Sequence, residues 1–151
     1  MDRLLERGAL CATVLDVSAA ALARSKNRLG SAHTRVRWIE TDVTSEWQID
    51  PVDVWHDRAV FHFLTEPTDR AQYLKRLRHA VKPGGTVLIA TFAPDGPEKC
   101  SGLQVRRYDA SALSAQLGAG FSIIDAVSEQ HPTPRGVMQS FCYAVFRVGG
   151  S

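Results

Sequence analysis

Residues 81–92 of this chain read VKPGGTVLIATF, and the fold class follows from this stretch. Pro83 and the two glycines after it predict a tight turn, because proline fixes the first corner and glycine takes the positive φ of the second. The apolar run at 86–92 is typical of a strand buried on both faces of a sheet. Ahead of the turn, residues 67–81 show helical spacing, with an inner stripe of Tyr73, Leu74, Leu77 and Val81.

Strand and helix patterns alternate on both sides of this stretch. Strands are predicted at 9–17, 35–40, 52–57, 121–127 and 140–148, and helices at 19–29 and 110–117. Ser18 is the expected N-cap of the first helix, and Gly30 its end. This order predicts an α/β fold with a Rossmann-like, mostly parallel sheet and helices on both faces. With no internal repeat and no interdomain linker, residues 1–151 are expected to form a single domain.

Composition excludes several classes of protein. The formal net charge is +2, and the basic residues are mixed with acids, so a nucleic-acid partner is not expected. The densest basic cluster is predicted to be a solvated helix face, formed by Lys75, Arg76, Arg78 and Lys82. No apolar run reaches the ~20 residues of a membrane span. The odd cysteine count predicts free thiols and a cytoplasmic protein, with Cys11 and Cys142 in the core and Cys100 in a loop.

Acidic residues stand at the ends of the predicted strands, where open α/β sheets bind ligands. Asp16 is expected to accept the hydroxyls of an adenosine ribose, and the alternative is a carboxylate that only caps the next helix. Asp42 is expected to accept a hydrogen bond from an adenine amino group while Val43 packs on the ring. The alternative for Asp42 is a turn-forming residue.

A further polar group follows the strand at 52–57. Asp57 and Arg58 are predicted beside the methionine portion of a cofactor or at a substrate entrance, and the alternative is an ion pair between the two side chains. Trp55 is assigned to core packing. His62 is a weak candidate for a general base, and a structural histidine is the alternative. No group of histidines, cysteines and acids has metal-ligand spacing, so no metal site is predicted.

These residues, in this order, resemble the class I S-adenosylmethionine-dependent methyltransferases. The segment 14–18 (VLDVS) resembles the family's ribose-binding motif, and Thr41-Asp42-Val43 resembles its adenine-contacting motif. Residues 52–64 and the Lys82-Pro83-Gly84-Gly85 turn are similar to the family's fourth strand and the entry to its fifth. The resemblance implies S-adenosylmethionine as cofactor, contacts from Asp16, Val17 and Ser18, and an antiparallel C-terminal strand.

One feature of the family has no counterpart in this sequence. No glycine-rich loop precedes Asp16, so the chain is expected to be N-terminally truncated, without the family's first strand, and residues 1–7 are expected to be the remnant of a helix that Gly8 ends. Because the family's first strand is central in its sheet, we expect this form to bind the cofactor poorly and to pair through exposed sheet edges, as in a homodimer.

The expected reaction is methyl transfer to an unknown acceptor, either a small molecule or a protein side chain. The loop at 93–108, with Arg106, Arg107 and Tyr108, is the expected region of substrate contact. Two alternatives remain open. One is a non-catalytic, methyltransferase-like subunit or pseudoenzyme, and the other is a fragment of an NAD-dependent dehydrogenase, because an acid after the second strand serves either cofactor.

Overall fold

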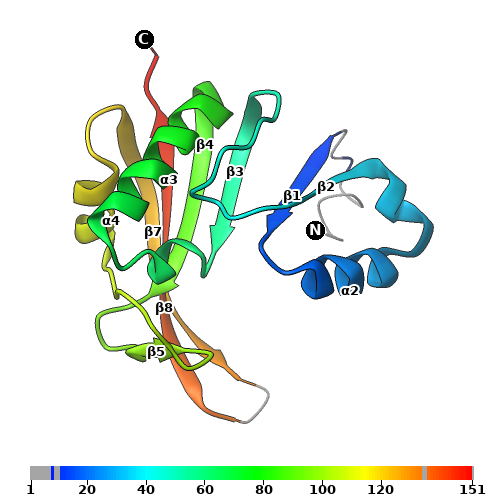
Figure 1. Ribbon diagram of the computed structural model, residues 1–151. Helices are drawn as coiled ribbons and strands as arrows, with labels where there is room; N and C mark the ends of the chain where they lie inside the picture. The colour runs from blue at the N-terminus through cyan, green and yellow to red at the C-terminus, as the bar shows by residue number, and fades with distance from the viewer. Residues whose placement is uncertain (1–7, 9–10, 134–135, 151) are drawn as a thin grey trace. The chain divides into compact units, whose positions relative to one another are not determined.

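The computed structural model describes residues 8, 11–133 and 136–150 of the chain. Its contacts divide the chain into two compact units, Met1–Ile49 and Asp50–Ser151, and each unit has a sheet of its own (Figure 1). The expectation of a single domain over residues 1–151 stays a prediction.

The first unit consists of two parallel strands connected by helices. Strand β1 (Ala12–Asp16) leads into α2 (Ala19–Leu29) and the 3₁₀ helix η1 (Gly30–Arg35), and β2 (Val36–Glu40) follows. The strands pair with Ala12 opposite Val36 and Asp16 opposite Glu40. Parallel strands need a crossover connection of this length, because a tight turn reverses the chain direction.

The ends of α2 follow from local chemistry. The Ser18 hydroxyl accepts a hydrogen bond from the Ala21 amide at 3.2 Å, which satisfies one of the free N–H groups of the first turn. Gly30 ends the helix with φ at +54°, a backbone angle that glycine adopts without steric cost. The predicted helix at residues 19–29 is confirmed, with both of its caps.

The first strand is shorter than the sequence pattern indicates. Pairing begins at Ala12, so Cys11 lies outside the strand and is exposed, and the prediction of a core role for Cys11 is wrong. Gly8 lies in a turn with φ at +87°. The helix expected at residues 1–7 falls outside the described residues.

The second unit contains a four-stranded sheet with the order β3-β4-β8-β7. Its strands are β3 (Val52–Arg58), β4 (Val81–Phe92), β7 (Phe121–Pro132) and β8 (Met138–Val148). Strand β8 runs antiparallel to both of its neighbours, whereas β3 and β4 are parallel to each other. Three strands therefore point one way, which confirms the mixed α/β class and the antiparallel C-terminal strand.

Two helices cover one face of this sheet, α3 (Pro67–Ala80) and α4 (Ala110–Leu117) (Figure 1). The alternating residues of β4 and β8 that face them are fully or almost fully buried, as are the inner residues of both helices. This core comprises Tyr73, Leu77, Val87, Ile89, Leu113, Leu117, Cys142, Ala144 and Phe146. Tyr73 and Leu77 of the predicted inner stripe are buried on α3, and the prediction of a buried Cys142 is confirmed. Leu74 of the stripe is half-buried, and Val81 is buried but begins β4.

The remaining elements lie at the carboxyl ends of β3 and β4. A short 3₁₀ helix, η2 (Phe61–Phe63), follows β3, and a two-stranded hairpin of β5 (Lys99–Cys100) and β6 (Leu103–Gln104) follows β4. Cys100 is half-buried in that hairpin. None of the helices in the described ranges has the length and apolar character that a membrane span requires.

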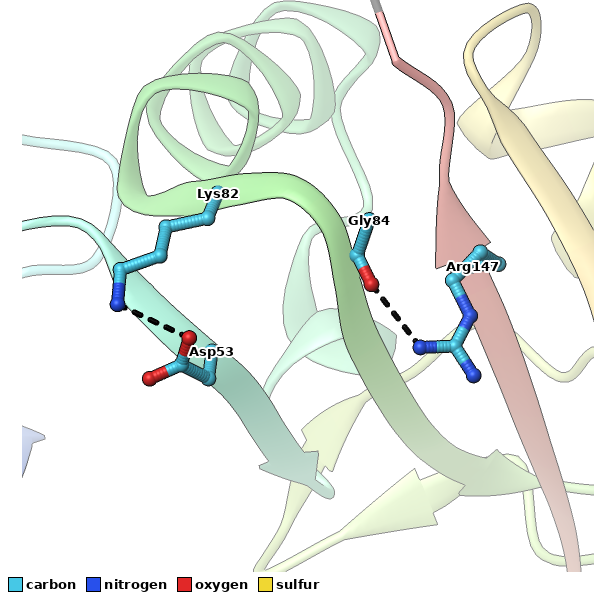
Figure 2. A network of polar contacts seen from close by, with 4 residues as sticks. All are labelled: Asp53, Lys82, Gly84 and Arg147. Atoms are coloured by element: carbon cyan, nitrogen blue, oxygen red, sulfur yellow. Dashed lines mark hydrogen bonds and ion pairs between the residues drawn. The ribbon is translucent and has the colours of Figure 1, made fainter.

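Strand β4 begins directly after α3, and its first residues are held by side chains from two other strands (Figure 2). Lys82 pairs with Asp53 of β3 at 2.9 Å, and Arg147 of β8 donates to the Gly84 carbonyl at 2.9 Å. Gly84 has the positive φ that the sequence predicts, +76°, but the predicted turn lies within β4, where the register against β3 shifts between Val81 and Thr86. Lys82 is half-exposed at the side chain, and Lys75 and Arg78 are also exposed, as expected for a solvated basic face, whereas Arg76 is half-buried.

Candidate functional site

Asp16 ends β1 with one carboxylate oxygen in use. Its Oδ1 accepts a hydrogen bond from the Ser18 amide at 2.8 Å, and the described residues make no other hydrogen bond to this carboxylate. Ser18 itself caps α2. Val17 stands between them with 72% of its surface exposed. The second oxygen of Asp16 is therefore free to accept a ribose hydroxyl, and the site fits the expected group.

Asp42 follows β2 and forms a local turn. Its Oδ1 accepts from the Thr44 amide at 2.7 Å and from the Thr44 hydroxyl at 2.6 Å. This is the turn-forming role given as the alternative for Asp42. The side chain is exposed, and Oδ2 has no partner among the described residues, so the turn and a ligand contact are compatible. Val43 is half-buried beside it.

A hollow of about 360 Å³ lies between α2 and β2 in the first unit. Lys26 lies over the Trp38 ring there, with its Nζ 5.6 Å from the ring centre. The hollow contains none of the predicted site residues, and its lining belongs to helix–strand packing. It is lined by Ala19, Leu22, Ala23, Lys26, Trp38 and Glu40.

In the second unit, Asp57 is buried at the carboxyl end of β3, with 4% of its surface exposed. Its oxygens accept hydrogen bonds from the Val60 amide at 2.9 Å, the Phe61 amide at 3.1 Å and the Tyr73 hydroxyl at 2.7 Å. Burial raises the pKa of Asp57 to about 6, against the lowering effect of these hydrogen bonds. The Asp57 oxygens are therefore occupied by hydrogen bonds within the protein, and the buried carboxylate is not accessible to a ligand.

Arg58 points away from Asp57 and makes different contacts. Its Nε donates to the Tyr143 hydroxyl at 3.3 Å, and its guanidinium lies 5.4 Å over the Phe141 ring. The ion pair between Asp57 and Arg58, given as the alternative, is therefore wrong. The separation follows from the strand, because successive side chains of β3 point to opposite faces of the sheet. Arg58 is exposed, and its terminal amino groups have no hydrogen bond among the described residues.

His62 is fully buried in η2, between the rings of Phe63 at 4.6 Å and Phe92 at 4.8 Å. Its Nδ1 accepts from the Phe92 amide at 3.4 Å, and Nε2 has no partner among the described residues. Burial lowers the pKa of His62 to about 4, so the ring is neutral at pH 7. This position favours the structural role for His62 over a general base.

The loop at 93–108 holds its own side chains in place. Arg106 donates to the Tyr108 hydroxyl at 3.0 Å, and Tyr108 is buried against Phe61 with ring centres 5.6 Å apart. Arg107 bonds to the Gly96 carbonyl and to Glu98, both at 3.2 Å. Tyr108 therefore packs in the core, whereas Arg106 and Arg107 are exposed.

The structure also shows an aromatic cluster that the sequence pattern does not predict. Phe92 and Phe141 pack edge to face at 4.9 Å, at the carboxyl end of β4. Cys100 and Val105 from the loop pack against them, together with Tyr143. No spacing along the chain identifies this cluster, because residues from β4, β8 and the loop meet only after the sheet forms. We call Phe92, Phe141 and Tyr143 the aromatic cluster. Phe92 and Phe141 are buried and Tyr143 is half-buried, while the exposed Arg58 lies over the Phe141 ring.

Among the residues that the structure describes, no three histidine, cysteine or acidic side chains are placed to hold a metal ion. The candidate groups in the first unit are therefore two strand-end carboxylates, which can accept hydrogen bonds from hydroxyl or amino groups. In the second unit the candidate is the exposed Arg58 over the aromatic cluster, which can hold an anionic group.

The chain matches the model of a methyltransferase domain family over residues 2–87, more than half of its length. It therefore belongs to the methyltransferase domain family. This match confirms the resemblance carried by the strand-end motifs and the Lys82-Pro83-Gly84-Gly85 turn.

Thiopurine S-methyltransferase from Vibrio atlanticus is 35% identical to the chain over 89 residues. This match covers 56% of the chain and 39% of that protein, so the chain spans well under half of the relative's length.

Two solved methyltransferases have the same fold. N-methyltransferase NodS from Bradyrhizobium japonicum superimposes with a TM-score of 0.73 at 16% identity, covering 93% of this chain and 74% of NodS. The 1,6-didemethyltoxoflavin-N1-methyltransferase from Burkholderia thailandensis, solved with S-adenosylhomocysteine, gives 0.73 at 23% identity, with 98% and 65% covered. These likenesses confirm the Rossmann-like fold, and the comparisons support S-adenosylmethionine as cofactor.

Proposed function

We propose that this chain binds S-adenosylmethionine, weakly in this form, and that the methyl group is transferred to a small-molecule acceptor. Membership of the methyltransferase domain family supports the reaction. Arg58, exposed at the carboxyl end of β3 with its guanidinium over the Phe141 ring, is the observation that favours a small acceptor with an anionic or planar part. Two of the similar proteins are named for small molecules, a thiopurine and 1,6-didemethyltoxoflavin.

In the first unit, Asp16 is proposed to hold the cofactor ribose through its free oxygen, with Val17 and Ser18 alongside. A carboxylate accepts hydrogen bonds without donating any, so it suits two neighbouring hydroxyls. Asp42 is proposed to accept from the adenine amino group, because its second oxygen is exposed while the first holds the turn. Val43 then packs on the adenine ring.

In the second unit, Arg58 and Asp57 are proposed to have different roles. Arg58 is proposed to contact the ligand, either at the methionine portion of the cofactor or at the substrate entrance, because its planar fork of donors matches a carboxylate. Asp57 contributes through the turn that follows β3, since its oxygens are occupied by Val60, Phe61 and Tyr73.

The bound cofactor supplies a methyl group that is activated by a positively charged sulfur. The residues of this chain then have to orient the ligand and exclude water, because holding the reacting groups in the right geometry lowers the barrier to transfer. His62 is buried and neutral, and therefore unsuited to remove a proton from an acceptor. An acceptor that loses its proton to solvent fits this site better than one that needs a strong base.

A titration of the chain with S-adenosylhomocysteine tests the cofactor assignment. Asp16→Asn keeps an oxygen for the Ser18 amide but removes the charge, so we expect affinity to fall by about 10-fold or more, as for a hydrogen bond to a charged group. Asp50→Asn, at an exposed acid outside the site, is the matched control and should leave affinity unchanged. Equal affinity for Asp16→Asn and wild type, or tighter binding of NAD than of S-adenosylhomocysteine, would contradict the assignment.

The homodimer is proposed to form through an open sheet edge. In the second unit, β7 is an outer strand of the sheet, and Ile124 and Val127 on it are 52% and 58% exposed. Unpaired strand edges with apolar side chains are sites of association. Light scattering at increasing protein concentration should show a dimer that Val127→Lys weakens. A monomer at every concentration would contradict this proposal.

A further inference from the structure

The backbone that follows β3 takes an unusual turn at Ala59. Its φ is +64°, in the left-handed region that residues with a side chain rarely adopt. The Ala59 amide donates to the Ala90 carbonyl of β4 at 2.8 Å, which ties the turn to the neighbouring strand. Such a conformation persists only where the surroundings hold it, and Ala59 comes directly after Arg58.

The Asp57 carboxylate holds the far side of this turn. It accepts from the Val60 amide at 2.9 Å and from the Phe61 amide at 3.1 Å, so it spans the strained residue from before it to after it. The hydrogen bond from Ala59 to Ala90 and the hydrogen bonds to the Asp57 carboxylate together fix the backbone here. They therefore fix the direction in which the Arg58 side chain points. Any movement of the Asp57 carboxylate therefore moves the backbone that presents Arg58.

Tyr73 fixes the position of this carboxylate from α3. Its hydroxyl donates to Asp57 Oδ2 at 2.7 Å and accepts a hydrogen bond from Trp55 Nε1 at 3.0 Å. Because the indole N–H can only donate, the Tyr73 hydroxyl has to direct its own hydrogen toward Asp57. Tyr73 is 1% exposed, so water does not replace these bonds. We call Trp55, Asp57 and Tyr73 the Tyr73 network.

We propose that Tyr73 is a positioning residue for Arg58, acting through Asp57 and the left-handed turn at Ala59. This inference rests on the proposed function, in which Arg58 contacts the ligand. Tyr73 is 1% exposed, and its side-chain hydrogen bonds go to Asp57 and Trp55 and not to Arg58. It determines where the guanidinium lies beside Tyr143 and Phe141, and hence how well Arg58 presents its charge to an anionic group.

The experiment uses Tyr73→Phe, which removes one oxygen and keeps the ring. Thr91→Val is the matched control, because Thr91 on β4 is a buried hydroxyl with no hydrogen-bond partner among the described residues. Two readouts are compared. One is the NMR signal of the Arg58 Nε–H together with the hydrogen exchange of the Val60 and Phe61 amides. The other is the dissociation constant for S-adenosylhomocysteine.

In Tyr73→Phe we expect the Arg58 Nε–H signal to shift, the two amides to exchange at least ~10-fold faster, and affinity to fall about 5-fold. Thr91→Val should change none of these. In the Asp57→Asn background, Tyr73→Phe should have little further effect on the Arg58 signal, since the two residues act as one unit.

Unchanged Arg58, Val60 and Phe61 signals in Tyr73→Phe would overturn the proposal, as would an additive effect of the two substitutions. A wild-type chain that binds no S-adenosylhomocysteine would contradict the proposed function, and the NMR signals would then decide the positioning role alone. Should Tyr73→Phe fail to fold, Trp55→Phe tests the same network. It should shift the same signals in the same direction, and no shift would overturn the proposal.

Discussion

The Tyr73 hydroxyl and the Asp57 carboxylate lie 2.7 Å apart inside the second unit, and neither is accessible to solvent to any useful degree. A carboxylate in such a place is costly to ionise, even with three donors around it. The same burial, with the Asp57 charge beside it, raises the pKa of Tyr73 well above its usual value. The stability of the second unit and the backbone geometry next to Arg58 therefore both depend on the buried Asp57 carboxylate.

The Asp57 carboxyl should make the fold less stable as pH rises. Its pKa is about 6 in the fold against 3.8 in the unfolded chain, so its stabilising contribution is full below pH 4 and is lost by pH 6. The change is about 3 kcal/mol at ~1.4 kcal/mol per pKa unit. Urea unfolding of wild type and Asp57→Asn should show a difference in unfolding free energy that changes across this range. A constant difference would show that Asp57 ionises normally.

His62 should act in the opposite direction. Its pKa is about 4 in the fold against 6.5 in the unfolded chain, so its contribution is full above pH 6.5 and is lost as pH falls toward 4. His62→Gln should therefore remove the loss of stability at low pH, as measured by urea unfolding at pH 7 and pH 4.5. The exposed His79→Gln serves as the control and should not change the profile. An acid profile identical to wild type in His62→Gln would refute the assignment.

Gly84 and Gly85, near the start of β4, should differ in their tolerance of alanine. A Cβ on Gly84 meets no atom within 4 Å, so Gly84→Ala has only the cost of its positive φ, about 1 kcal/mol. A Cβ on Gly85 would lie 2.6 Å from Val81 Cγ1 and 2.8 Å from the Lys82 carbonyl. Gly85→Ala should thus cost roughly 2–3 kcal/mol or more in thermal unfolding. The reverse order would be incompatible with this geometry.

Replacing Arg70 should destabilise the fold even when the new side chain keeps the positive charge. Its guanidinium, 9% exposed, donates to Gln116 Oε1 at 3.0 Å, the Leu64 carbonyl at 2.8 Å and the Thr65 carbonyl at 2.7 Å. Lysine keeps the charge but cannot reproduce this fork, so Arg70→Lys should cost about 2 kcal/mol in chemical unfolding. A loss below ~0.5 kcal/mol would show that the fork contributes little.

The surface ion pair of Lys82 and Asp53 should contribute little. Their side chains are 48% and 81% exposed, and such pairs are typically worth less than ~1 kcal/mol. Lys82→Ala should therefore lower the midpoint of thermal unfolding only slightly, and high salt should remove most of the difference from wild type. A large effect that persists at high salt would mean that Lys82 acts through some other contact.

Local features of the fold could be predicted well from the sequence. The limits of α2 follow from Ser18 and Gly30, and α4 begins after Asp109, whose carboxylate accepts from the Ala112 amide at 2.7 Å. These interactions join residues three or four positions apart, so the amino-acid sequence is enough to predict them. The strand-end acids were found for the same reason, because position after a strand is a property of the sequence.

Contacts between distant residues could not be read in this way. Asp57 and Arg58 are neighbours in the chain, and an ion pair was a reasonable alternative. The strand sends one side chain to Tyr73 on α3 and the other to Tyr143 on β8. Cys11 was assigned to the core from its apolar neighbours, but the strand begins one residue later.

The sequence by itself determined the family, the α/β class and the residues that end each strand, because these depend on local spacing and on turn chemistry. Only the tertiary structure decided that β8 lies between β4 and β7, that Tyr73 holds Asp57, and that Arg58 lies over Phe141. Strand order is fixed by which apolar faces bury together, and that choice places residues far apart in the chain within hydrogen-bond distance.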